Sequence, residues 1–166
     1  DYISELSKTH GEIIRQKTGL VMDAYFSASK IKWLIDNVPQ IREKLAKNEV
    51  CFGTVDSFLI YKLTGGKAFV TDVTNASRTM LFNLQTLSYD NELLDIFGIP
   101  LSSLPKVVSS DAVVGEFEYM GNKIPLCGVA GDQQSAMIGQ GCFSVGTSKV
   151  TYGTGLFMLY NLGEKA

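Results

Sequence analysis

The 166-residue sequence has few of the residues that build metal or thiol chemistry. It contains one histidine, His10, and three cysteines, Cys51, Cys127 and Cys142, which are far apart and form no CxxC pair. A nucleophilic cysteine needs a neighbouring base, and a His/Cys metal site needs several ligands at close spacing. The sequence therefore argues against a nucleophilic cysteine and against a His/Cys metal site, and we expect no metal-ligating residues. We also expect the three thiols to be reduced, as in cytoplasmic proteins.

An excess of one charge and long apolar runs are also missing. Lys and Arg number 15 against 17 Asp and Glu, which gives a net charge of -2 and an isoelectric point near 5.4. Without a basic excess, nucleic acid and anionic membranes are not expected partners. No apolar run approaches the ~20 residues of a membrane span. No signal peptide is visible, and the first residue is Asp1. We expect a cytoplasmic protein, and a homo-oligomer remains open.

The remaining composition, 45% hydrophobic and 19% charged, is ordinary for a globular chain. Apolar periodicity and capping residues predict helices at 1–19, 29–37, from Pro39 onward, 54–63, 91–97 and about 133–141. Runs that favour β-strands lie at 68–71, around 107–117, and at 124–130, 149–152 and 156–161. The polar run 74–77 is typical of a turn. The mixture predicts an α/β fold.

An aspartate stands where an apolar run meets a helix-compatible segment. The run 124–130 leads to Gly131 and Asp132, and Gln133 and Gln134 follow. The helix macrodipole favours a carboxylate at that position, and a base that takes a proton from an alcohol must be ionised. The two amides suit a polyol. The alternative is that Asp132 is a plain N-cap, which the local sequence by itself slightly favours.

A second glycine-rich turn follows at 151–155, with the sequence Thr-Tyr-Gly-Thr-Gly. Its glycines would let backbone N–H groups approach an anion, and the Thr154 hydroxyl adds a donor. It is not a P-loop, because no Gly-Lys-Ser/Thr follows. The alternative is a tight hairpin in which glycine is chosen for positive φ.

Two further segments have a functional and a structural interpretation. Tyr25 has small polar neighbours and would line a polyol pocket, or it is a half-buried aromatic before a helix. The run 71–78 is dense in hydroxyls and amides, which usually bond their own backbone and shape a turn. Direct ligand contact by 71–78 is the less favoured interpretation.

Together these segments resemble the glycerol kinases of the FGGY carbohydrate kinase family. The resemblance extends from about residue 18 to 166 and rests on the runs 52–60, 71–83, 130–134 and 151–155. The Gly-Asp-Gln-Gln and Thr-Tyr-Gly-Thr-Gly segments are shared more loosely among sugar kinases. The Asp-x-Tyr-Phe-Ser run at 23–27 and the run 74–83 are similar to glycerol kinases more narrowly.

The resemblance implies two actin-like, ribonuclease-H-like α/β domains with ATP and a polyol in the cleft between them. Residues 1–146 would be the later part of the first FGGY domain, and 147–166 the opening β-hairpin of the second. The family's first phosphate-binding loop, its glycerol-binding Arg-Glu pair and its adenosine-binding glycines have no counterpart in this sequence. We therefore expect a partial domain that is inactive when isolated.

The resemblance also implies roles for individual residues. Asp132 would be the base acting on a glycerol hydroxyl, with Gln133 beside it on the substrate. Tyr25 would hydrogen-bond glycerol, and Phe157 would pack on its carbon side. The reaction would convert ATP and glycerol to glycerol 3-phosphate and ADP.

The nucleotide side of the reaction would use the second glycine turn. Thr154, with Gly153 beside it, would contact nucleotide phosphate, and Mg²⁺ would neutralise charge on the phosphates. Two alternatives stay open: another FGGY kinase acting on a pentulose or other polyol, and a non-catalytic actin-like binding module in which Asp132 is only a cap.

Overall fold

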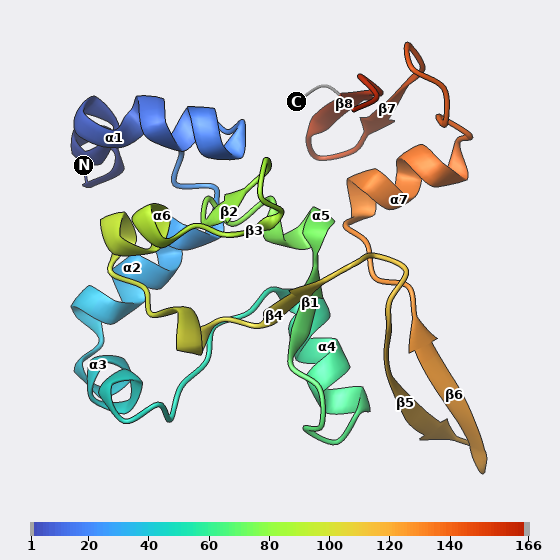
Figure 1. The fold of residues 1–166 in the computed structure, drawn as a ribbon, viewed down its shortest axis with the longest axis horizontal. Helices are drawn as coiled ribbons and strands as arrows, with labels where there is room; N and C mark the ends of the chain where they lie inside the picture. Colours follow the sequence, from blue (N-terminus) through green and yellow to red (C-terminus); the bar gives the residue numbers. More distant parts are fainter. Residues whose placement is uncertain (1, 165–166) are drawn as a thin grey trace. The chain divides into compact units, whose positions relative to one another are not determined.

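The computed structural model describes residues 2–164, in which four helices come first and a mixture of helices and strands follows (Figure 1). The chain divides into two compact units, one ending at Val129 and one beginning at Ala130. Each unit is described by itself below. The expected domain boundary after residue 146 stays a prediction. Within residues 2–164, no helix has the length and apolar character needed to cross a bilayer.

Three helices begin the first unit: α1 (Tyr2–Thr18), α2 (Ser27–Asn37) and α3 (Pro39–Ala46). They confirm the predicted helices, with Asp1 outside the described residues. Proline at the first position of α3 explains the break after α2, because its fixed φ suits a helix start and its missing N–H would have no intrahelical partner there.

Two strands that are separated by a long connection form a short parallel sheet in the first unit. The helix α4 (Val55–Leu63) ends before the glycines at 65 and 66, and β1 (Val70–Asp72) follows. β1 pairs in parallel with β4 (Lys106–Val108), and Thr71 faces Val107. The connection between these strands contains α5 (Val73–Ala76), the pair β2 (Phe82–Asn83) and β3 (Ser88–Tyr89), α6 (Asn91–Phe97) and a 3-10 turn (Leu101–Ser103).

The helix α6 is capped at both ends. The Asp90 side chain caps it by accepting the N–H groups of Glu92 and Leu93 at 3.0 and 3.4 Å. Gly98 ends it in the left-handed region, with φ 62°, which glycine adopts without a steric penalty. The boundaries 91–97 are therefore confirmed.

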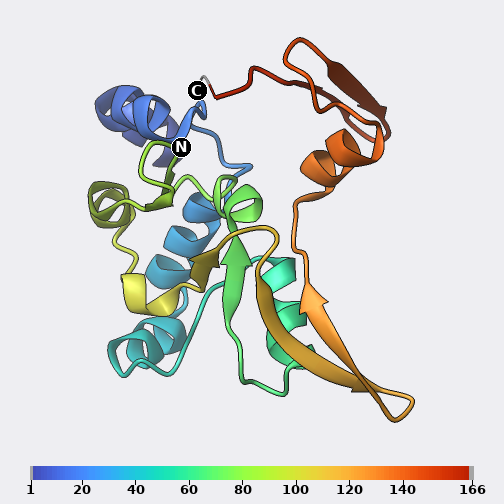
Figure 2. The ribbon, with the colours of Figure 1, turned by 45° about the vertical axis from the view of Figure 1, so that its right-hand side comes forward.

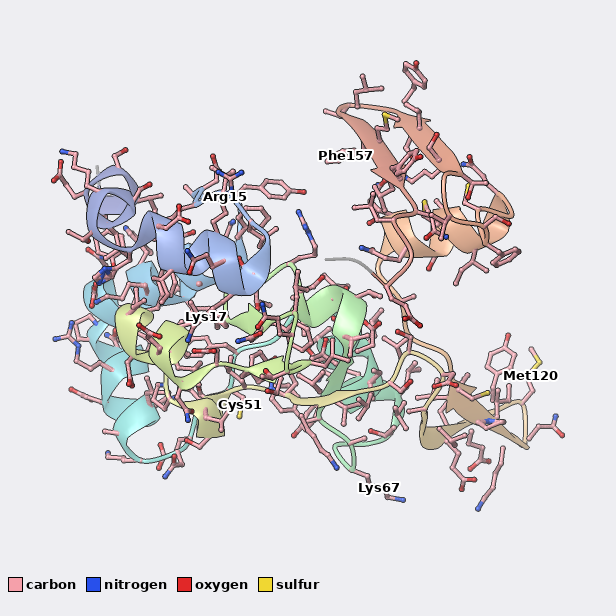
Figure 3. All side chains as sticks on the ribbon, turned by 45° about the horizontal axis from the view of Figure 1, so that its top comes forward. Arg15, Lys17, Cys51, Lys67, Met120 and Phe157 are labelled. Carbon is pink, nitrogen blue, oxygen red and sulfur yellow. The ribbon has the colours of Figure 1, made fainter. Side chains whose placement is uncertain are left out.

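An antiparallel hairpin, β5 (Val113–Tyr119) and β6 (Asn122–Cys127), closes the first unit. Its far end projects from the unit, with Met120 at the tip (Figures 2 and 3). Near its base, a Cβ on Gly115 would lie 2.7 Å from Thr64 Cγ2, so glycine permits the approach to the end of α4. The predicted strand 124–130 was too long: residues 128–130 leave the ladder because β5 offers no partner beyond Val113.

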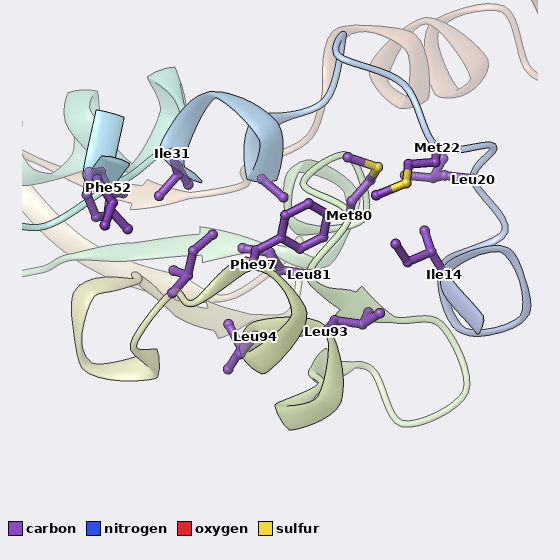
Figure 4. Packing of buried hydrophobic residues seen from close by; sticks show 13 residues of the cluster. Ile14, Leu20, Met22, Ile31, Phe52, Met80, Leu81, Leu93, Leu94 and Phe97 are labelled. Atoms are coloured by element: carbon purple, nitrogen blue, oxygen red, sulfur yellow. The ribbon is translucent and has the colours of Figure 1, made fainter. Parts of the chain in front are cut away.

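The apolar core of the first unit gathers side chains from α1, α2, α6 and the segment before β2 (Figure 4). Its fully buried members include Ile14, Met80, Leu81, Leu93 and Phe97. Removing a buried ring such as that of Phe97 typically costs about 3–5 kcal/mol, because the cavity is only partly refilled. This core fixes α1, α2 and α6 against the chain that follows β1.

A charged cluster joins the end of α1 to the start of α6. The Lys17 ammonium donates to Asp90 and to Glu92, both at 2.7 Å, and Asn83 donates to Asp90 at 2.8 Å. Burial raises the pKa of Asp90, but the hydrogen bonds from Lys17 and Asn83 outweigh it and lower the pKa overall. The hydrogen bonds that Lys17 donates to Asp90 and Glu92 raise the pKa of Lys17. The cluster adds a polar tie beside the apolar core.

Asp72 is a fully buried carboxylate at the end of β1. It accepts the backbone N–H groups of Thr74 and Asn75, both at 3.0 Å, and their side chains, both at 2.7 Å. The Ser110 hydroxyl, beyond the end of β4, donates to it at 2.7 Å. The predicted turn at 74–77 is therefore wrong in detail: the carboxylate caps a short helix, α5, which begins at Val73.

The second unit consists of α7 (Asp132–Gly139) and the antiparallel hairpin β7 (Ser148–Tyr152) and β8 (Leu156–Tyr160). The predicted hairpin is confirmed, with Thr151 opposite Phe157. Asn161 ties the loop between α7 and β7 to the hairpin, because its side chain donates to the Cys142 carbonyl at 3.0 Å and its carbonyl accepts from Gly146 at 2.9 Å.

Asp72→Asn should lower the free energy of unfolding at pH 7 by about 2 kcal/mol, because an amide cannot accept from all five donors that surround this buried position. Burial raises the pKa of Asp72, but the hydrogen bonds from Ser110, Thr74 and Asn75 lower it below its ordinary value. The carboxylate therefore stabilises the fold above the unfolded pKa of about 3.9 and loses that effect as the pH falls through the folded pKa.

Urea unfolding of both proteins between pH 3 and 7 checks this, and the difference between them should shrink below about pH 4. Asp36→Asn is the matched control, because Asp36 is paired with Lys32 on the exposed face of α2. Its effect should stay within about 0.5 kcal/mol. A difference for Asp72→Asn that is absent at pH 7, or that grows as the pH falls, would contradict the assignment.

Candidate functional site

Asp132 begins α7 and its side chain is exposed. The N-cap position belongs to Gly131, so the alternative that Asp132 is the N-cap does not apply. One oxygen of the carboxylate accepts the backbone N–H of Gln133 at 2.8 Å, and the other accepts from the Gln133 side-chain amide at 3.3 Å. The backbone and side-chain N–H groups of Gln133 thus hold the carboxylate in place, and the rest of the carboxylate is exposed to solvent.

Lys149 holds the Gln133 side chain from the opposite direction. It lies in β7, is 2% exposed, and donates to the Gln133 side-chain oxygen and, at 2.6 Å, to the Thr151 hydroxyl. The structure therefore joins the start of α7 to the first strand of the hairpin. Sequence reasoning missed this residue. The sequence signal that could have found it is the alternation of side chains along a strand, which puts residues 149 and 151 on the same face.

The turn between β7 and β8 contains Gly153, Thr154 and Gly155. The Gly153 N–H donates to the Gly155 carbonyl at 3.1 Å. Neither glycine lies in the left-handed region, so the expectation of glycine chosen for positive φ is wrong. Gly155 is needed for space instead, because a Cβ there would lie 2.8 Å from Phe157 Cε2.

Thr154 lies at the exposed tip of that turn. Among the hydrogen bonds described for residues 2–164, its hydroxyl has no partner, so it is open to a ligand. Phe157, on β8, is 41% exposed, and its ring lies close to Gly155. A hydroxyl donor and an aromatic face therefore stand on the same hairpin.

Tyr25 belongs to the first unit, in the turn before α2. It is 66% exposed, so the half-buried interpretation is wrong. Its backbone N–H donates to Asp23 at 2.7 Å, its ring meets Phe26 edge-on at 5.4 Å, and the Lys30 ammonium lies 5.8 Å from its ring centroid. The turn is held in place while the phenol stays accessible.

The run 71–78 forms structure rather than an open polar surface. Thr71 donates to Asp56 at 2.7 Å, and Thr74 and Asn75 bond Asp72. The Arg78 guanidinium stacks over the Phe26 ring, 5.0 Å from its centroid, next to Tyr25. The favoured structural interpretation of this run is therefore confirmed, and the run supports the turn that carries Tyr25.

The structure thus brings some of the predicted residues together. Asp132 and Gln133 are bonded to each other in the second unit, and Gly153, Thr154 and Phe157 share its hairpin. Tyr25 is described with the first unit. An exposed carboxylate beside an oriented amide can accept a proton from an alcohol, and an exposed hydroxyl in a glycine turn can donate to an anion.

Comparison with known families decides what kind of protein this is. The profile of the FGGY family of carbohydrate kinases, N-terminal domain, matches residues 1–139. The chain belongs to the FGGY family of carbohydrate kinases. Its mixed α/β fold is therefore the actin-like, ribonuclease-H-like fold that the resemblance predicted, of which the chain covers a part.

Individual FGGY relatives include glycerol kinases. The chain is 54% identical to the glycerol kinase of Bacillus thuringiensis over 162 residues, which are 96% of this chain and 33% of that protein. It is 52% identical to the glycerol kinase of Bacillus mycoides over the same shares of both. The chain thus spans about a third of the length of the curated relatives that it matches.

Solved structures agree with this placement in the FGGY family. The crystal structure of Plasmodium falciparum glycerol kinase with ADP superposes with a TM-score of 0.92 at 42% identity, over 99% of this chain and 33% of that one. The ligand-bound xylulose kinase from Lactobacillus acidophilus superposes with a TM-score of 0.80 at 25% identity, over 95% of this chain and 32% of that one.

Gly155→Ala should displace the Phe157 ring, because the new methyl would overlap Cε2 and Cζ. The ring is partly exposed and can swing away, so we expect a loss of only about 1 kcal/mol in unfolding free energy together with shifted Phe157 ring signals in NMR spectra. Gly153→Ala is the matched control, since its Cβ would meet only the Gly155 carbonyl oxygen, at 3.9 Å. Equal effects of both variants on the ring signals would contradict the role of Gly155.

Proposed function

We propose that this FGGY chain is part of a longer kinase that phosphorylates glycerol with ATP to give glycerol 3-phosphate and ADP. The observation that carries the proposal is the exposed Asp132 carboxylate beside the Gln133 amide, in a chain 54% identical to a glycerol kinase. In this proposal residues 1–146 complete the first FGGY domain, and 147–166 open the second.

Asp132 is the proton acceptor in the proposed step. The glycerol hydroxyl oxygen attacks the γ-phosphorus of ATP, so an oxygen–phosphorus bond forms while the bond between that phosphorus and the bridging oxygen breaks. The electron pair of the broken bond leaves with ADP, and the hydroxyl proton passes to the Asp132 carboxylate. Because such transition states are loose, the protein contributes chiefly by positioning the hydroxyl and stabilising charge.

Three further side chains would bind the polyol. Gln133 hydrogen-bonds it beside Asp132, and the Tyr25 hydroxyl binds a second oxygen. The Phe157 ring covers the carbon side of glycerol, which has no hydrogen-bonding group to satisfy. The exposure of Tyr25 and Phe157 supports these roles, because both rings can reach a ligand without unfolding their surroundings.

Thr154 and Gly153 would contact nucleotide phosphate at the tip of the β7–β8 turn. Their fit rests on an exposed threonine hydroxyl that has no partner among the hydrogen bonds of residues 2–164. Mg²⁺ would enter with ATP, since it is usually held by substrate phosphates and one or two carboxylates, and it would neutralise phosphate charge. A cytoplasmic setting would suit both the ATP supply and the free thiols of Cys51 and Cys127 at the surface.

Asp132→Asn should lower kcat by about 10²–10⁴-fold in the longer kinase, because an amide cannot accept the proton. The thermal midpoint should stay unchanged, since the side chain is exposed. A coupled assay of ADP release with glycerol measures the rate. Asp95→Asn, which changes an exposed carboxylate on α6, is the matched control and should retain wild-type kcat. Near-normal turnover of Asp132→Asn would refute the base assignment.

The substrate is tested separately, by comparing kcat/KM of the wild-type kinase for glycerol, xylulose and erythritol. We expect glycerol to be preferred by at least about 100-fold, because xylulose and erythritol are longer and carry hydroxyls for which a site shaped around glycerol offers no room and no partners. A preference for xylulose or erythritol would assign the chain to another FGGY activity. No turnover of any of the three would favour a binding module.

A further inference from the structure

Lys149 is an unusual residue for a small hairpin unit, because its charged side chain is 2% exposed. A buried ammonium is unfavourable unless its N–H groups are satisfied. Both of its acceptors, the Gln133 side-chain oxygen and the Thr151 hydroxyl, are neutral. The ion pairs described for residues 2–164 do not include it. Lys149 therefore depends on the Gln133 amide, and the dependence is mutual.

The contact decides which way the Gln133 amide faces. An ammonium only donates, so the amide oxygen must turn toward Lys149. The amide nitrogen then turns the other way, where it donates to the second oxygen of Asp132 at 3.3 Å. One amide hydrogen is used by Asp132, and the other remains for a ligand. Because the oxygen end of the amide is turned toward Lys149, the end of Gln133 that lies beside Asp132 presents a donor.

We propose that Lys149 is a positioning residue that fixes the Gln133 amide, so that its nitrogen faces Asp132 and donates to an oxygen of the bound polyol. This inference rests on the proposed function of the site. Lys149 acts through Gln133 and needs no contact with the substrate. It links the proposed base on α7 to the hairpin that carries Thr154 and Phe157, and it makes the site select an oxygen that can accept a hydrogen bond.

Lys149→Met tests this, because methionine keeps an unbranched stem and removes the ammonium. In the longer kinase we expect kcat/KM for glycerol to fall by about 10- to 100-fold, mainly through KM for glycerol, with KM for ATP changed less than about twofold. Lys149→Arg keeps donors toward Gln133 and should recover most of the loss. Lys123→Met, which removes a charge paired with Glu116 on the exposed β5–β6 hairpin, should leave both constants unchanged.

A double-mutant cycle separates positioning from a purely structural role. In the Gln133→Ala background, Lys149→Met should cost less than about twofold further, because the amide it orients is gone. An equal loss in both backgrounds would overturn the proposal, and so would wild-type kinetics of Lys149→Met. A fall in thermal midpoint with unchanged KM for glycerol would also overturn it.

A third measurement does not depend on catalysis or on the variant folding. In the glutamine-¹⁵N-labelled longer kinase, the Gln133 side-chain amide should give resonances displaced from those of Gln134, whose side chain has no bond among those described for residues 2–164. Coincident, rapidly exchanging Gln133 and Gln134 signals would overturn the proposal. If wild-type protein fails to phosphorylate glycerol while Gln133 shows displaced signals, the proposed function falls and the orienting role of Lys149 stands.

Discussion

The first unit depends on one buried carboxylate. Asp72 ends β1, starts α5 and holds Ser110 beyond the end of β4, so a single side chain ties a strand and the helix that follows it to a segment 38 residues further along the chain. Burial alone would favour the neutral acid, but five donors around the carboxylate reverse that preference. The start of α5 fixes the position of the chain that follows it. That chain carries Met80 and Leu81 into the apolar core and places the Arg78 guanidinium over the Phe26 ring.

In the second unit a buried cation, Lys149, links separate segments as the buried Asp72 carboxylate does in the first unit. No residue of α7 is fully buried, although Ala136 and Met137 are half-buried. The buried Lys149 ammonium bridges the helix and its hairpin by way of Gln133 and Thr151. The proposed catalytic carboxylate thus stands on a helix whose side-chain tie is polar and directional. A directional tie fixes the orientation of an amide, which apolar packing does not.

The sequence predicted those parts of the fold whose signals are local. Gly98 marks the end of α6, and Pro39 marks the start of α3, because caps and proline act within one turn of helix. The β7–β8 hairpin followed from two β-prone runs around glycines. The residues proposed for the site came from motif resemblance, and the local sequence alone slightly favoured a cap role for Asp132 that the structure gives to Gly131.

The features that sequence reasoning missed depend on contacts between distant residues. Residues 128–130 leave β6 where its partner strand ends, and Gly128, which has a φ of +135°, is a local signal of that end. In the sequence, Lys149 cannot be told from any other lysine in a strand, because its contact with the Gln133 side chain forms only in the folded unit. A polar tie of this kind is weak as pure stabilisation, since an apolar side chain of similar volume often serves as well. Its presence beside an exposed carboxylate is better explained by orientation than by stability, because only a donor at this position dictates which end of the Gln133 amide faces Asp132.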